Sequence, residues 1–388
     1  MTTDISDNKL FCTAPWVGIT VREDGHVRTC CIGKTSLGNL NQNSIVEILR
    51  SHPLKQIQQR MLSGEPDLDN CRTCIDSQNR NGLTPIQEHY NKFYPEIIKD
   101  QIELKFLDIR WNNLCNLGCM YCDPMFSSVW QDRQKIKRAS VVKDYQDELL
   151  DWILEKSHQI KEILLVGGEP MLMKQNYALI NQLSDECRIS VITNLSYNLP
   201  ELPCTPKLLN RPRSNTVWNV SLDNTGMQFE YVRNGGNWSQ IEKNLKYLNQ
   251  HWSGLISINY VYSMFSAFSI VETIQTLNEL GIKKINLLPI ASNHTMNLFN
   301  MPAPIRQLAA EQIKLAQQWH FNNLHPEDKD LYPLQGTDAI LEHLEASVKA
   351  TPITSKMFFD KINWYDQYNQ QKFKDLWPNV IDLVEKYL

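Results

Sequence analysis

The sequence predicts an α/β fold in which six strand–helix units follow a small cysteine-rich region and precede a helical one. From about residue 104, six short apolar segments alternate with amphipathic helical stretches. Eight of the ten cysteines lie in the first third of the chain, and residues 300–388 show mostly helical periodicity. Repeated β-α units indicate a parallel sheet with right-handed crossovers. Six units would make an open sheet or an incomplete barrel.

The composition excludes several classes of protein. The length of 388 residues suggests two or three domains. With 42% hydrophobic and 21% charged residues, the composition is typical of a globular chain and not of a disordered one. The net charge of −4 provides no large basic surface for nucleic acid or an anionic membrane. The first seven residues lack the features of a signal peptide, and no run reaches the ~20 apolar residues that span a bilayer. We therefore expect a soluble, cytoplasmic protein. We expect neither nucleic acid nor a membrane among its partners.

Residues 1–100 are predicted to form a small, irregular domain. A strand over 17–21, an Asp-Gly turn and a return strand over 26–32 form a hairpin that ends at two adjacent cysteines. An amphipathic helix is expected over 44–61, ahead of a Cys-x-x-Cys pair. The region contains too little apolar material for an independent core, so a metal centre could stabilise it.

Residues 101–300 are predicted to hold the strand–helix units, and residues 301–388 a helical region. An amphipathic helix over 144–160 is typical of the helices between the strands. The strands themselves are expected at residues 104–111, 162–168, 188–194, 216–223, 254–263 and 283–290.

Two of the predicted strands carry a polar row on one face. In the fourth, Asn219, Ser221 and Asp223 alternate with apolar residues, and in the fifth Ser257 and Asn259 do the same. Parallel strands covered on both faces should be apolar almost throughout. The polar row therefore indicates a lumen lined for a polar ligand, with a sheet that has one solvated face as the alternative.

Three cysteines follow the first of these strands, at the spacing Cys115-x3-Cys119-x2-Cys122. A cytosolic chain gains little from disulfides, so clustered cysteines favour a metal or iron–sulfur site. No fourth cysteine follows within sixty residues, whereas a structural zinc needs four ligands. Three thiolates can hold three irons of a 4Fe-4S cube. The open fourth iron can then bind a chelating ligand, such as the amino and carboxylate groups of a methionine moiety.

With a second motif, this spacing resembles the radical S-adenosylmethionine (radical SAM) superfamily. Tyr121 stands just before the last cysteine, and Gly167-Gly168-Glu169-Pro170 follows the second predicted strand, like the family's Gly-Gly-Glu-Pro motif. The resemblance implies a partial (β/α)6, TIM-like barrel that binds a 4Fe-4S cluster and S-adenosyl-L-methionine.

The resemblance also implies roles for individual residues, with Cys115, Cys119 and Cys122 as the ligands of the catalytic cluster. Besides the Gly-Gly-Glu-Pro motif, the residues expected near S-adenosylmethionine are Tyr121 at the adenine, Ser221 and Arg233 at the methionine carboxylate, and Asn194 and Asn259 at the ribose or carboxylate. Within the motif, the glycines would permit close backbone approach to the ligand, and Glu169 would accept a hydrogen bond from the methionine ammonium. A solvated position for Arg233, and ordinary strand hydrogen bonds for Asn194 and Asn259, are the alternatives.

The N-terminal cysteines resemble a second element, the SPASM domain in its shorter twitch form, which holds one auxiliary 4Fe-4S cluster. The match rests on the spacing between the first two ligands and on the later Cys-x-x-Cys pair, although this element usually follows the barrel. The implied ligands are Cys12, Cys30, Cys71 and Cys74, with Cys30 favoured over Cys31 by spacing. A structural zinc at the same four positions is the alternative.

The resemblance implies an enzyme that cleaves S-adenosylmethionine reductively to a 5′-deoxyadenosyl radical, which takes a hydrogen atom from a substrate. A flavodoxin or ferredoxin would supply the electron. A peptide or protein is the first choice of substrate, because enzymes with this auxiliary element often modify peptides; a small amino acid, sugar or nucleoside is the second. A non-catalytic electron-transfer or scaffold protein is the alternative of another class. Cys187 and Cys204 could donate a hydrogen atom or be inert buried thiols.

Overall fold

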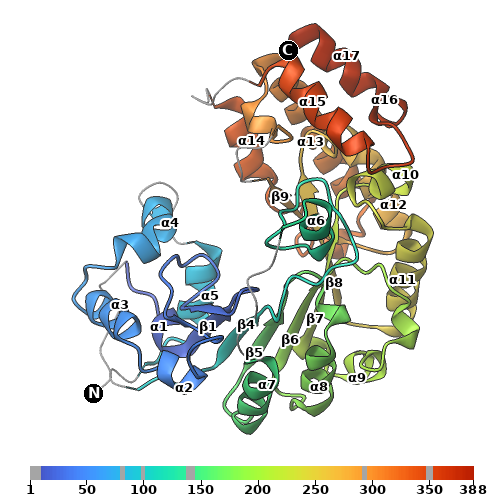
Figure 1. The fold of residues 1–388 in the computed structure, drawn as a ribbon. Coiled ribbons are helices and arrows are strands. Elements are labelled where there is room, and N and C mark those ends of the chain that lie inside the picture. Colours follow the sequence, from blue (N-terminus) through green and yellow to red (C-terminus); the bar gives the residue numbers. More distant parts are fainter. Residues whose placement is uncertain (1–9, 79–83, 98–100, 137–144, 291–294, 347–352) are drawn as a thin grey trace. The chain divides into compact units, whose positions relative to one another are not determined.

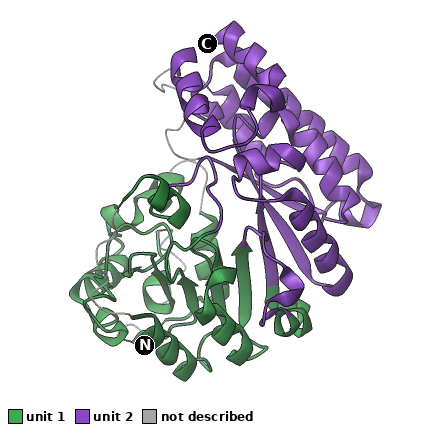
Figure 2. Ribbon diagram, turned by 45° about the vertical axis from the view of Figure 1, so that its right-hand side comes forward, with its two compact units in different colours: residues 1–115, 124–192, 206–216 green, residues 116–123, 193–205, 217–388 purple. Residues whose placement is uncertain are grey.

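The structure is a computed structural model that describes residues 10–78, 84–97, 101–136, 145–290, 295–346 and 353–388. It has the predicted α/β class, with parallel strands alternating with helices and a helical C-terminal part (Figure 1). The chain forms two compact units (Figure 2): unit 1 holds residues 1–115, 124–192 and 206–216, and unit 2 holds residues 116–123, 193–205 and 217–388. The domain ranges 1–100, 101–300 and 301–388 stay predictions.

All six predicted strands are confirmed, each a little shorter than expected. Unit 1 contains β4 (Phe106–Ile109), β5 (Glu162–Leu165) and nearly all of β6 (Arg188–Thr193), and these pair in parallel in that order. Unit 2 contains β8 (Leu255–Tyr262), β9 (Lys284–Pro289) and all of β7 (Thr216–Leu222) except its first residue. These strands also pair in parallel, in the order β7-β8-β9.

The N-terminal hairpin extends the sheet of unit 1. β1 (Gly18–Val21) pairs antiparallel with β2 (His26–Arg28) through the predicted Asp-Gly turn, in which Gly25 has a φ of 82°. On its other edge, β1 pairs in parallel with β4. β3 (Gly38–Asn39) completes the order β3-β2-β1-β4-β5-β6 within this unit. The predicted hairpin is therefore confirmed, and it is continuous with the strand that leads to the cysteine triad.

The single helix predicted over 44–61 is wrong, because this segment forms two helices. α2 (Ile45–Ile48) begins at a capping box between Ser44 and Glu47. α3 (His52–Leu62) begins one residue before Pro53, whose missing N–H and ring are tolerated only in the first turn of a helix. Periodicity continues through the break, which is why the pattern alone did not show it.

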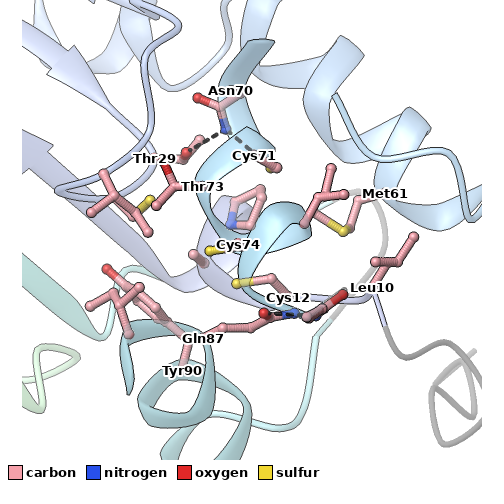
Figure 3. A pocket seen from close by; sticks show the side chains of 17 residues that line it. Leu10, Cys12, Thr29, Met61, Asn70, Cys71, Thr73, Cys74, Gln87 and Tyr90 are labelled. Atoms are coloured by element: carbon pink, nitrogen blue, oxygen red, sulfur yellow. Dashed lines mark hydrogen bonds between the residues drawn. The ribbon is translucent and has the colours of Figure 1, made fainter. Parts of the chain in front are cut away.

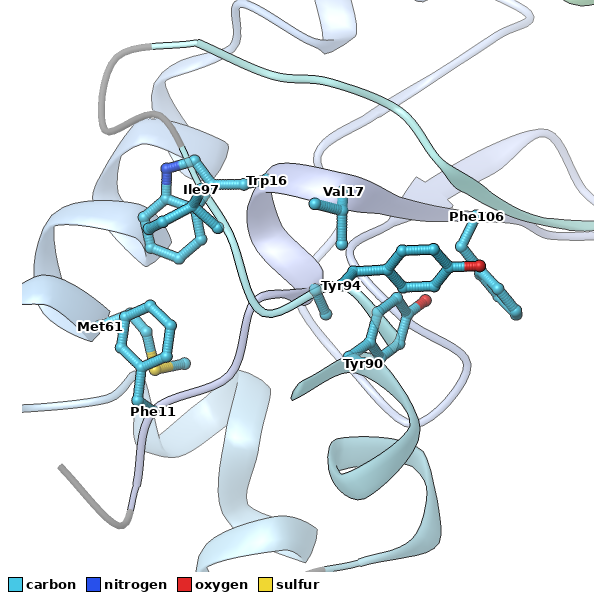
Figure 4. Close-up of a cluster of buried hydrophobic side chains, with 9 residues drawn as sticks. Phe11, Trp16, Val17, Met61, Tyr90, Tyr94, Ile97 and Phe106 are labelled. Atoms are coloured by element: carbon cyan, nitrogen blue, oxygen red, sulfur yellow. The ribbon is translucent and has the colours of Figure 1, made fainter. Parts of the chain in front are cut away.

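Buried aromatic and aliphatic side chains hold the N-terminal elements of unit 1 together. Figure 4 shows this cluster, which consists of Phe11, Ala14, Trp16, Val17, Met61, Tyr90, Tyr94, Ile97 and Phe106. Phe106 belongs to β4, so the N-terminal region shares its core with the first strand of the repeated units. This explains how a region with little apolar material of its own can be packed.

Short helices complete unit 1. They include α1 (Ala14–Val17), α4 (Leu68–Gln78), α5 (Pro85–Phe93), α6 (Ser128–Arg133), α7 (Tyr145–Glu155) and α8 (Lys174–Gln182). α7 ends earlier than the predicted 144–160, and residue 144 lies outside the described residues.

The predicted helical character after residue 300 is confirmed. The helices from the second half of the chain are α9 (Thr205–Asn210), α10 (Gly226–Val232), α11 (Trp238–His251), α12 (Ile270–Glu279), α13 (Ala303–Asn323), α14 (Thr337–Glu345), α15 (Ser355–Asp366), α16 (Phe373–Leu376) and α17 (Pro378–Tyr387). Among the described residues, none of the helices is long and apolar enough to cross a membrane.

Candidate active site and auxiliary cluster site

The three-cysteine loop connects β4 to α6, and the boundary between the two units runs through it. Cys115 belongs to unit 1, whereas Cys119 and Cys122 belong to the segment 116–123 of unit 2.

In unit 1, hydrogen bonds to α6 hold the start of the loop. The Cys115 N–H donates to the Ser128 hydroxyl at 3.1 Å, and the same hydroxyl donates to the Cys115 carbonyl at 3.1 Å. The side-chain amide of Asn113 donates to the Pro124 carbonyl at 2.8 Å and to Gln131 Oε1 at 3.1 Å. These hydrogen bonds fix the position of the Cys115 backbone without the help of a bound ligand.

The glycine pair at the end of β5 lies directly against this loop. A Cβ added at Gly168 would stand 2.2 Å from the carbonyl oxygen of Leu114, a distance that no real Cβ contact shows. Gly167 has a φ of 118°, which favours glycine, and the Glu169 N–H donates to the same Leu114 carbonyl at 2.8 Å. The close approach that the glycines permit here is to the backbone of the cysteine loop. Their contact with S-adenosylmethionine stays a prediction.

Glu169 is fully buried at the start of a short 3-10 helix, Pro170–Leu172. Its Oε1 accepts a hydrogen bond from the Met171 N–H at 3.1 Å and so caps that helix. Pro170 is held in turn, because its carbonyl accepts from the Asn176 side chain at 2.8 Å. The predicted hydrogen bond from a methionine ammonium to Glu169 stays a prediction.

The contact at Gly168 leads to a prediction for the Gly168→Ala variant. The added methyl group would force the Leu114 backbone to move, at a cost of about 1–3 kcal/mol, the usual penalty for overpacking. We expect weaker binding of S-adenosylmethionine and less of the radical-site cluster, measured by iron content and by the change in the cluster's spectrum on adding S-adenosylmethionine. Gly226→Ala is the control for backbone strain without a clash, because a Cβ there meets nothing within 4 Å although its φ of 57° disfavours alanine; it should keep its iron and its binding of S-adenosylmethionine. Unchanged iron and binding in Gly168→Ala would contradict the packing argument.

In unit 2, the rest of the loop is held by backbone and side-chain bonds. The N–H groups of Gly118 and Met120 donate to the carbonyls of Asn234 and Val232, at 2.8 and 2.9 Å. Asn194 follows β6, and its side-chain amide donates to Asn116 Oδ1 at 3.0 Å. Asn194 therefore contacts the loop between the first two cysteines, and its predicted contact with the ribose or carboxylate stays open.

Tyr121 and Arg233 meet at a buried carboxylate, that of Asp223. The Tyr121 hydroxyl donates to Asp223 Oδ2 at 2.8 Å, and Arg233 Nη2 donates to Oδ1 of the same carboxylate at 3.0 Å. The Arg233 guanidinium carbon lies 5.8 Å from the centre of the Tyr121 ring. Asp223 and Arg233 are 0% and 4% exposed, so the alternative of a solvated Arg233 is wrong.

The charges of this buried group act on one another. Burial, the largest single influence, would lower the pKa of Arg233, but Asp223, Tyr121 and Cys119 together outweigh it and raise that pKa. Burial, followed by the charge of Asp223, raises the pKa of the Tyr121 hydroxyl, although Arg233 opposes this change. Arg233 is therefore cationic and Tyr121 neutral at any physiological pH. The Nε of Arg233 is buried and has no hydrogen-bond partner among the described residues.

Ser221 and Asn259 lie side by side, as the polar row on the two strands predicted. They are register partners on β7 and β8, and Asn259 is in turn the partner of Asn286 on β9. The Asn286 side-chain amide donates to Ser257 Oγ at 2.9 Å and to Asn259 Oδ1 at 3.4 Å. Ser257 is only 1% exposed, whereas Ser221, Asn259 and Asn286 are half-buried, so the row decides neither for the lumen nor for the solvated face.

Helix α15 lies near the cysteine loop within unit 2. Asn234, whose backbone carbonyl accepts from the Gly118 N–H, donates through its side-chain amide to the Tyr368 carbonyl at 2.9 Å. Burial raises the pKa of Tyr365, and the charges of Cys122 and Cys119 raise it further, so this hydroxyl is close enough to interact with both thiols. The aromatic group at the end of α15 is thus part of the surroundings of the loop, a feature that its spacing in the sequence did not reveal.

Four N-terminal cysteines line one cavity in unit 1, shown in Figure 3. These are Cys12, Cys30, Cys71 and Cys74, and α4 carries the last two. Burial is the largest influence on all four and raises the pKa of each thiol, to about 12 for Cys30 and about 11 for Cys71. The thiols also raise one another's pKa, as expected for groups that share a site.

Each of these sulfurs has a hydrogen-bond donor beside it. Cys12 interacts with the backbone N–H of Ala14, and Cys30 with those of Ile32 and Gly33. The Asn70 amide donates to Cys71 Sγ at 3.6 Å, and Thr84 Oγ1 lies 3.1 Å from Cys74 Sγ. Such donors stabilise thiolates.

This set of donors fits an iron–sulfur cluster. Within the described ranges, no three or more Cys, His, Asp or Glu side chains converge on a point as a single ion would require. A 4Fe-4S cluster needs no such convergence, because each thiolate binds a different iron. The positive irons would also reverse the raised thiol pKa values, as a coordinated metal deprotonates a thiol outright.

Cys31 does not line this cavity, although it is adjacent to Cys30 in the chain. After burial, the strongest influences on its thiol pKa are Asp108, which raises it, and Arg110, which lowers it. Arg110 donates to the buried Asp108 carboxylate at 3.3 Å and lies near Glu23. The two adjacent thiols therefore lie in different surroundings.

Cys187 and Cys204 are both buried, with 2% and 0% exposure. Burial raises the pKa of their thiols to about 11 and about 12. These surroundings are those of inert thiols.

The sequence alone did not identify four residues that contact these sites, namely Asp223, Ser128, Asn70 and Thr84. Asp223 had one signal, because it ends the polar row on the fourth predicted strand. The other three stand within a few residues of a cysteine in the chain or in a neighbouring turn, but nothing in their spacing distinguishes them from ordinary capping residues.

Two sequence models of known protein families match parts of this chain. The sequence model of the radical SAM superfamily matches residues 109–263. The model named SPASM, an iron-sulfur cluster-binding domain, matches residues 12–75.

Two curated relatives are similar over part of their length. GTP 3′,8-cyclase of Peptoclostridium acidaminophilum is 26% identical over 194 residues, which are 48% of this chain and 56% of that protein. 7-carboxy-7-deazaguanine synthase of Clostridium acetobutylicum is 33% identical over 87 residues, which are 22% of this chain and 35% of that protein. The chain thus spans less than two thirds of each curated relative.

Among solved structures, native anSMEcpe with bound AdoMet has 14% identity and a TM-score of 0.42, covering 60% of this chain and 63% of the other. SuiB of Streptococcus suis bound to S-adenosylmethionine has 14% identity and a TM-score of 0.41, covering 70% of this chain and 62% of the other.

Proposed function

Since this chain belongs to the radical SAM superfamily and carries a SPASM iron–sulfur domain on the N-terminal side of its catalytic domain, we propose that it modifies a peptide or protein. It is an enzyme whose cofactors are S-adenosylmethionine, a 4Fe-4S cluster and an auxiliary iron–sulfur cluster. The observation that carries the proposal of a peptide substrate is the SPASM match over residues 12–75, together with the four thiols around one cavity.

When bound, the cluster and S-adenosylmethionine supply a 5′-deoxyadenosyl radical that takes a hydrogen atom from the substrate. We propose that Cys115, Cys119 and Cys122 hold this cluster and leave one iron open. The chain's own groups keep the loop in place: α6 holds the Cys115 backbone, and Asn234 holds Gly118. A loop held by these hydrogen bonds needs less ordering when the reacting groups bind.

Arg233 is proposed to bind the methionine carboxylate while it orients Tyr121. Its Nη2 donates a hydrogen bond to Asp223, but its buried Nε has no hydrogen-bond partner among the described residues. A buried cationic N–H without an acceptor is costly, and a carboxylate would satisfy it. Ser221 and Asn259, side by side on the polar row, are proposed as further polar contacts of the same ligand.

Cys12, Cys30, Cys71 and Cys74 are proposed as the four ligands of the auxiliary cluster. Four protein thiols would leave no iron open, so the substrate would not bind to this cluster directly. A low-potential carrier such as flavodoxin or ferredoxin is proposed as the electron donor.

A small molecule is the second candidate substrate. It is favoured by the GTP 3′,8-cyclase, which matches 48% of this chain and whose name states that it acts on GTP. The amide and hydroxyl groups of the polar row, Ser257, Asn259 and Asn286, could bind a polar metabolite as well as a peptide backbone.

The formation of 5′-deoxyadenosine tests the two candidates. The anaerobically reconstituted chain is given S-adenosylmethionine and dithionite, with a mixed peptide library or with GTP. We expect the peptides to increase 5′-deoxyadenosine formation and to show a mass change, and GTP to have no effect. Stimulation by GTP alone would favour the small-molecule substrate. A protein that holds its cluster and cleaves no S-adenosylmethionine under any condition would contradict the enzymatic proposal.

The proposed auxiliary ligands predict different results for two neighbouring cysteines. Cys30→Ser should remove or weaken the auxiliary cluster, because Cys30 lines the cavity, and iron should fall from about eight towards about four atoms per chain. Cys31→Ser should leave the iron content unchanged, because Cys31 lies near Asp108 and Arg110 instead. Iron analysis and the EPR signal of the reduced protein measure both variants. The reverse pattern would assign Cys31 as the ligand.

A further inference from the structure

Tyr90 lies beside the auxiliary cavity, and no described residue bonds to its hydroxyl. It belongs to α5 and lines the same cavity as Cys12, Cys30, Cys71 and Cys74 (Figure 3). The side chain is 1% exposed, and its hydroxyl oxygen is buried without a hydrogen-bond partner among the described residues. Buried tyrosine hydroxyls nearly always have a partner, because an unmade hydrogen bond costs about 1–3 kcal/mol.

The packing around Tyr90 keeps the hydroxyl in this position. Its ring meets Phe106 edge-to-face, with the ring centres 5.2 Å apart. The end of the ring lies on Gly18 of β1, where an added Cβ would stand 2.6 Å from the hydroxyl oxygen. A glycine at this position of the strand is therefore needed to admit the hydroxyl. The fold thus accommodates a buried hydroxyl group for which the described residues provide no hydrogen-bond partner.

The neighbours of the hydroxyl indicate which partner it lacks. After burial, which raises the Tyr90 pKa most, the strongest influences are the thiols of Cys30 and Cys12, followed by Cys31 and Asp108. The proposed auxiliary ligands Cys71 and Cys74 each have a side-chain donor, from Asn70 and Thr84. At Cys30 and Cys12 the structure shows backbone donors only, and the Tyr90 hydroxyl is an unused side-chain donor near both.

We propose that the Tyr90 hydroxyl donates a hydrogen bond to the auxiliary cluster on the side of Cys30 and Cys12 and thereby raises the cluster's reduction potential. The inference rests on the proposed ligand set. A reduced cluster carries one more negative charge than an oxidised one, so a donor stabilises the reduced form more. Hydrogen bonds to the sulfurs are one of the factors that set cluster potentials. Tyr90 is in this sense a tuning residue and not a ligand.

The test is a redox titration of the full-length protein with both clusters reconstituted, followed by EPR. Adding S-adenosylmethionine identifies the radical-site signal, because only that cluster has an open iron. For Tyr90→Phe we expect the auxiliary cluster's equilibrium constant for reduction to fall roughly tenfold, which is about 59 mV for a one-electron couple. The iron content should stay equal to that of the wild type.

Tyr94→Phe is the matched control. Tyr94 belongs to the same buried cluster of side chains, but its hydroxyl donates to Glu162 at 3.4 Å and does not line the cavity. This variant should titrate like the wild type. An unchanged potential in Tyr90→Phe with full iron would overturn the inference, and so would loss of the auxiliary cluster in that variant, because Tyr90 would then be structural. A wild type without a second cluster would instead refute the proposed ligand set.

Discussion

Replacing Cys119 with alanine is expected to abolish the formation of 5′-deoxyadenosine and to leave the auxiliary cluster in place. Cys119 is one of three thiols in the loop, and three are the minimum that holds a 4Fe-4S cube with one open iron. Its loss should lower the iron content from about eight to about four atoms per chain. Cys115→Ala and Cys122→Ala should behave in the same way. Product measured by chromatography, beside iron analysis, checks all three variants.

Cys187→Ala provides the matched control for this experiment. It removes a thiol that is 2% exposed and belongs to neither cysteine group. Iron content and product formation should both remain at the wild-type level. Formation of 5′-deoxyadenosine by Cys119→Ala at the wild-type rate would contradict the assignment of the triad.

The Asp223→Asn variant is expected to show the largest loss of stability. Asp223 is the counter-charge of Arg233, and the side chains are 1% and 5% exposed. An asparagine could still accept a hydrogen bond from Tyr121, but it would leave the Arg233 charge buried and uncompensated. Breaking a buried ion pair in this way costs about 3–5 kcal/mol. Urea unfolding, followed by fluorescence or circular dichroism, would measure the change in the free energy of unfolding.

Glu242→Gln serves as the control for Asp223→Asn. Glu242 pairs with Lys246 one turn along α11, and both side chains are about a third exposed or more. Pairs of this kind contribute about 0–1 kcal/mol, so the control should unfold almost like the wild type. If Asp223→Asn lost no more stability than Glu242→Gln, the buried pair would not hold Tyr121 and the cysteine loop in place.

The strand–helix order was predictable from the residues because it depends on local pattern. Each of the six strands, from β4 to β9, is a short apolar segment between amphipathic helices, and all six were found where expected. The break between α2 and α3 was missed for the same reason: the apolar periodicity continues across it, and only Pro53 marks the new start.

The candidate site was only partly predictable. The cysteine triad and Gly167–Pro170 are contiguous motifs, so their residue types and spacing can be recognised in one dimension. The partners of these motifs come from distant parts of the chain, as Asp223 does for Tyr121 and Leu114 does for Gly168. No spacing rule connects residues that meet only after folding.

Chain-local features thus specified the class of the protein, its two groups of cysteines and the residues of its motifs. Tertiary structure decided that β1 pairs with β4, that Cys30 lines the cavity while Cys31 lies near Asp108, and that Arg233 is paired with a buried carboxylate. Those outcomes depend on which strand edges pair and on which side of a turn each side chain lies. Both are settled by long-range packing and by the cost of burying unpaired polar groups, which the order of the residues along the chain does not display.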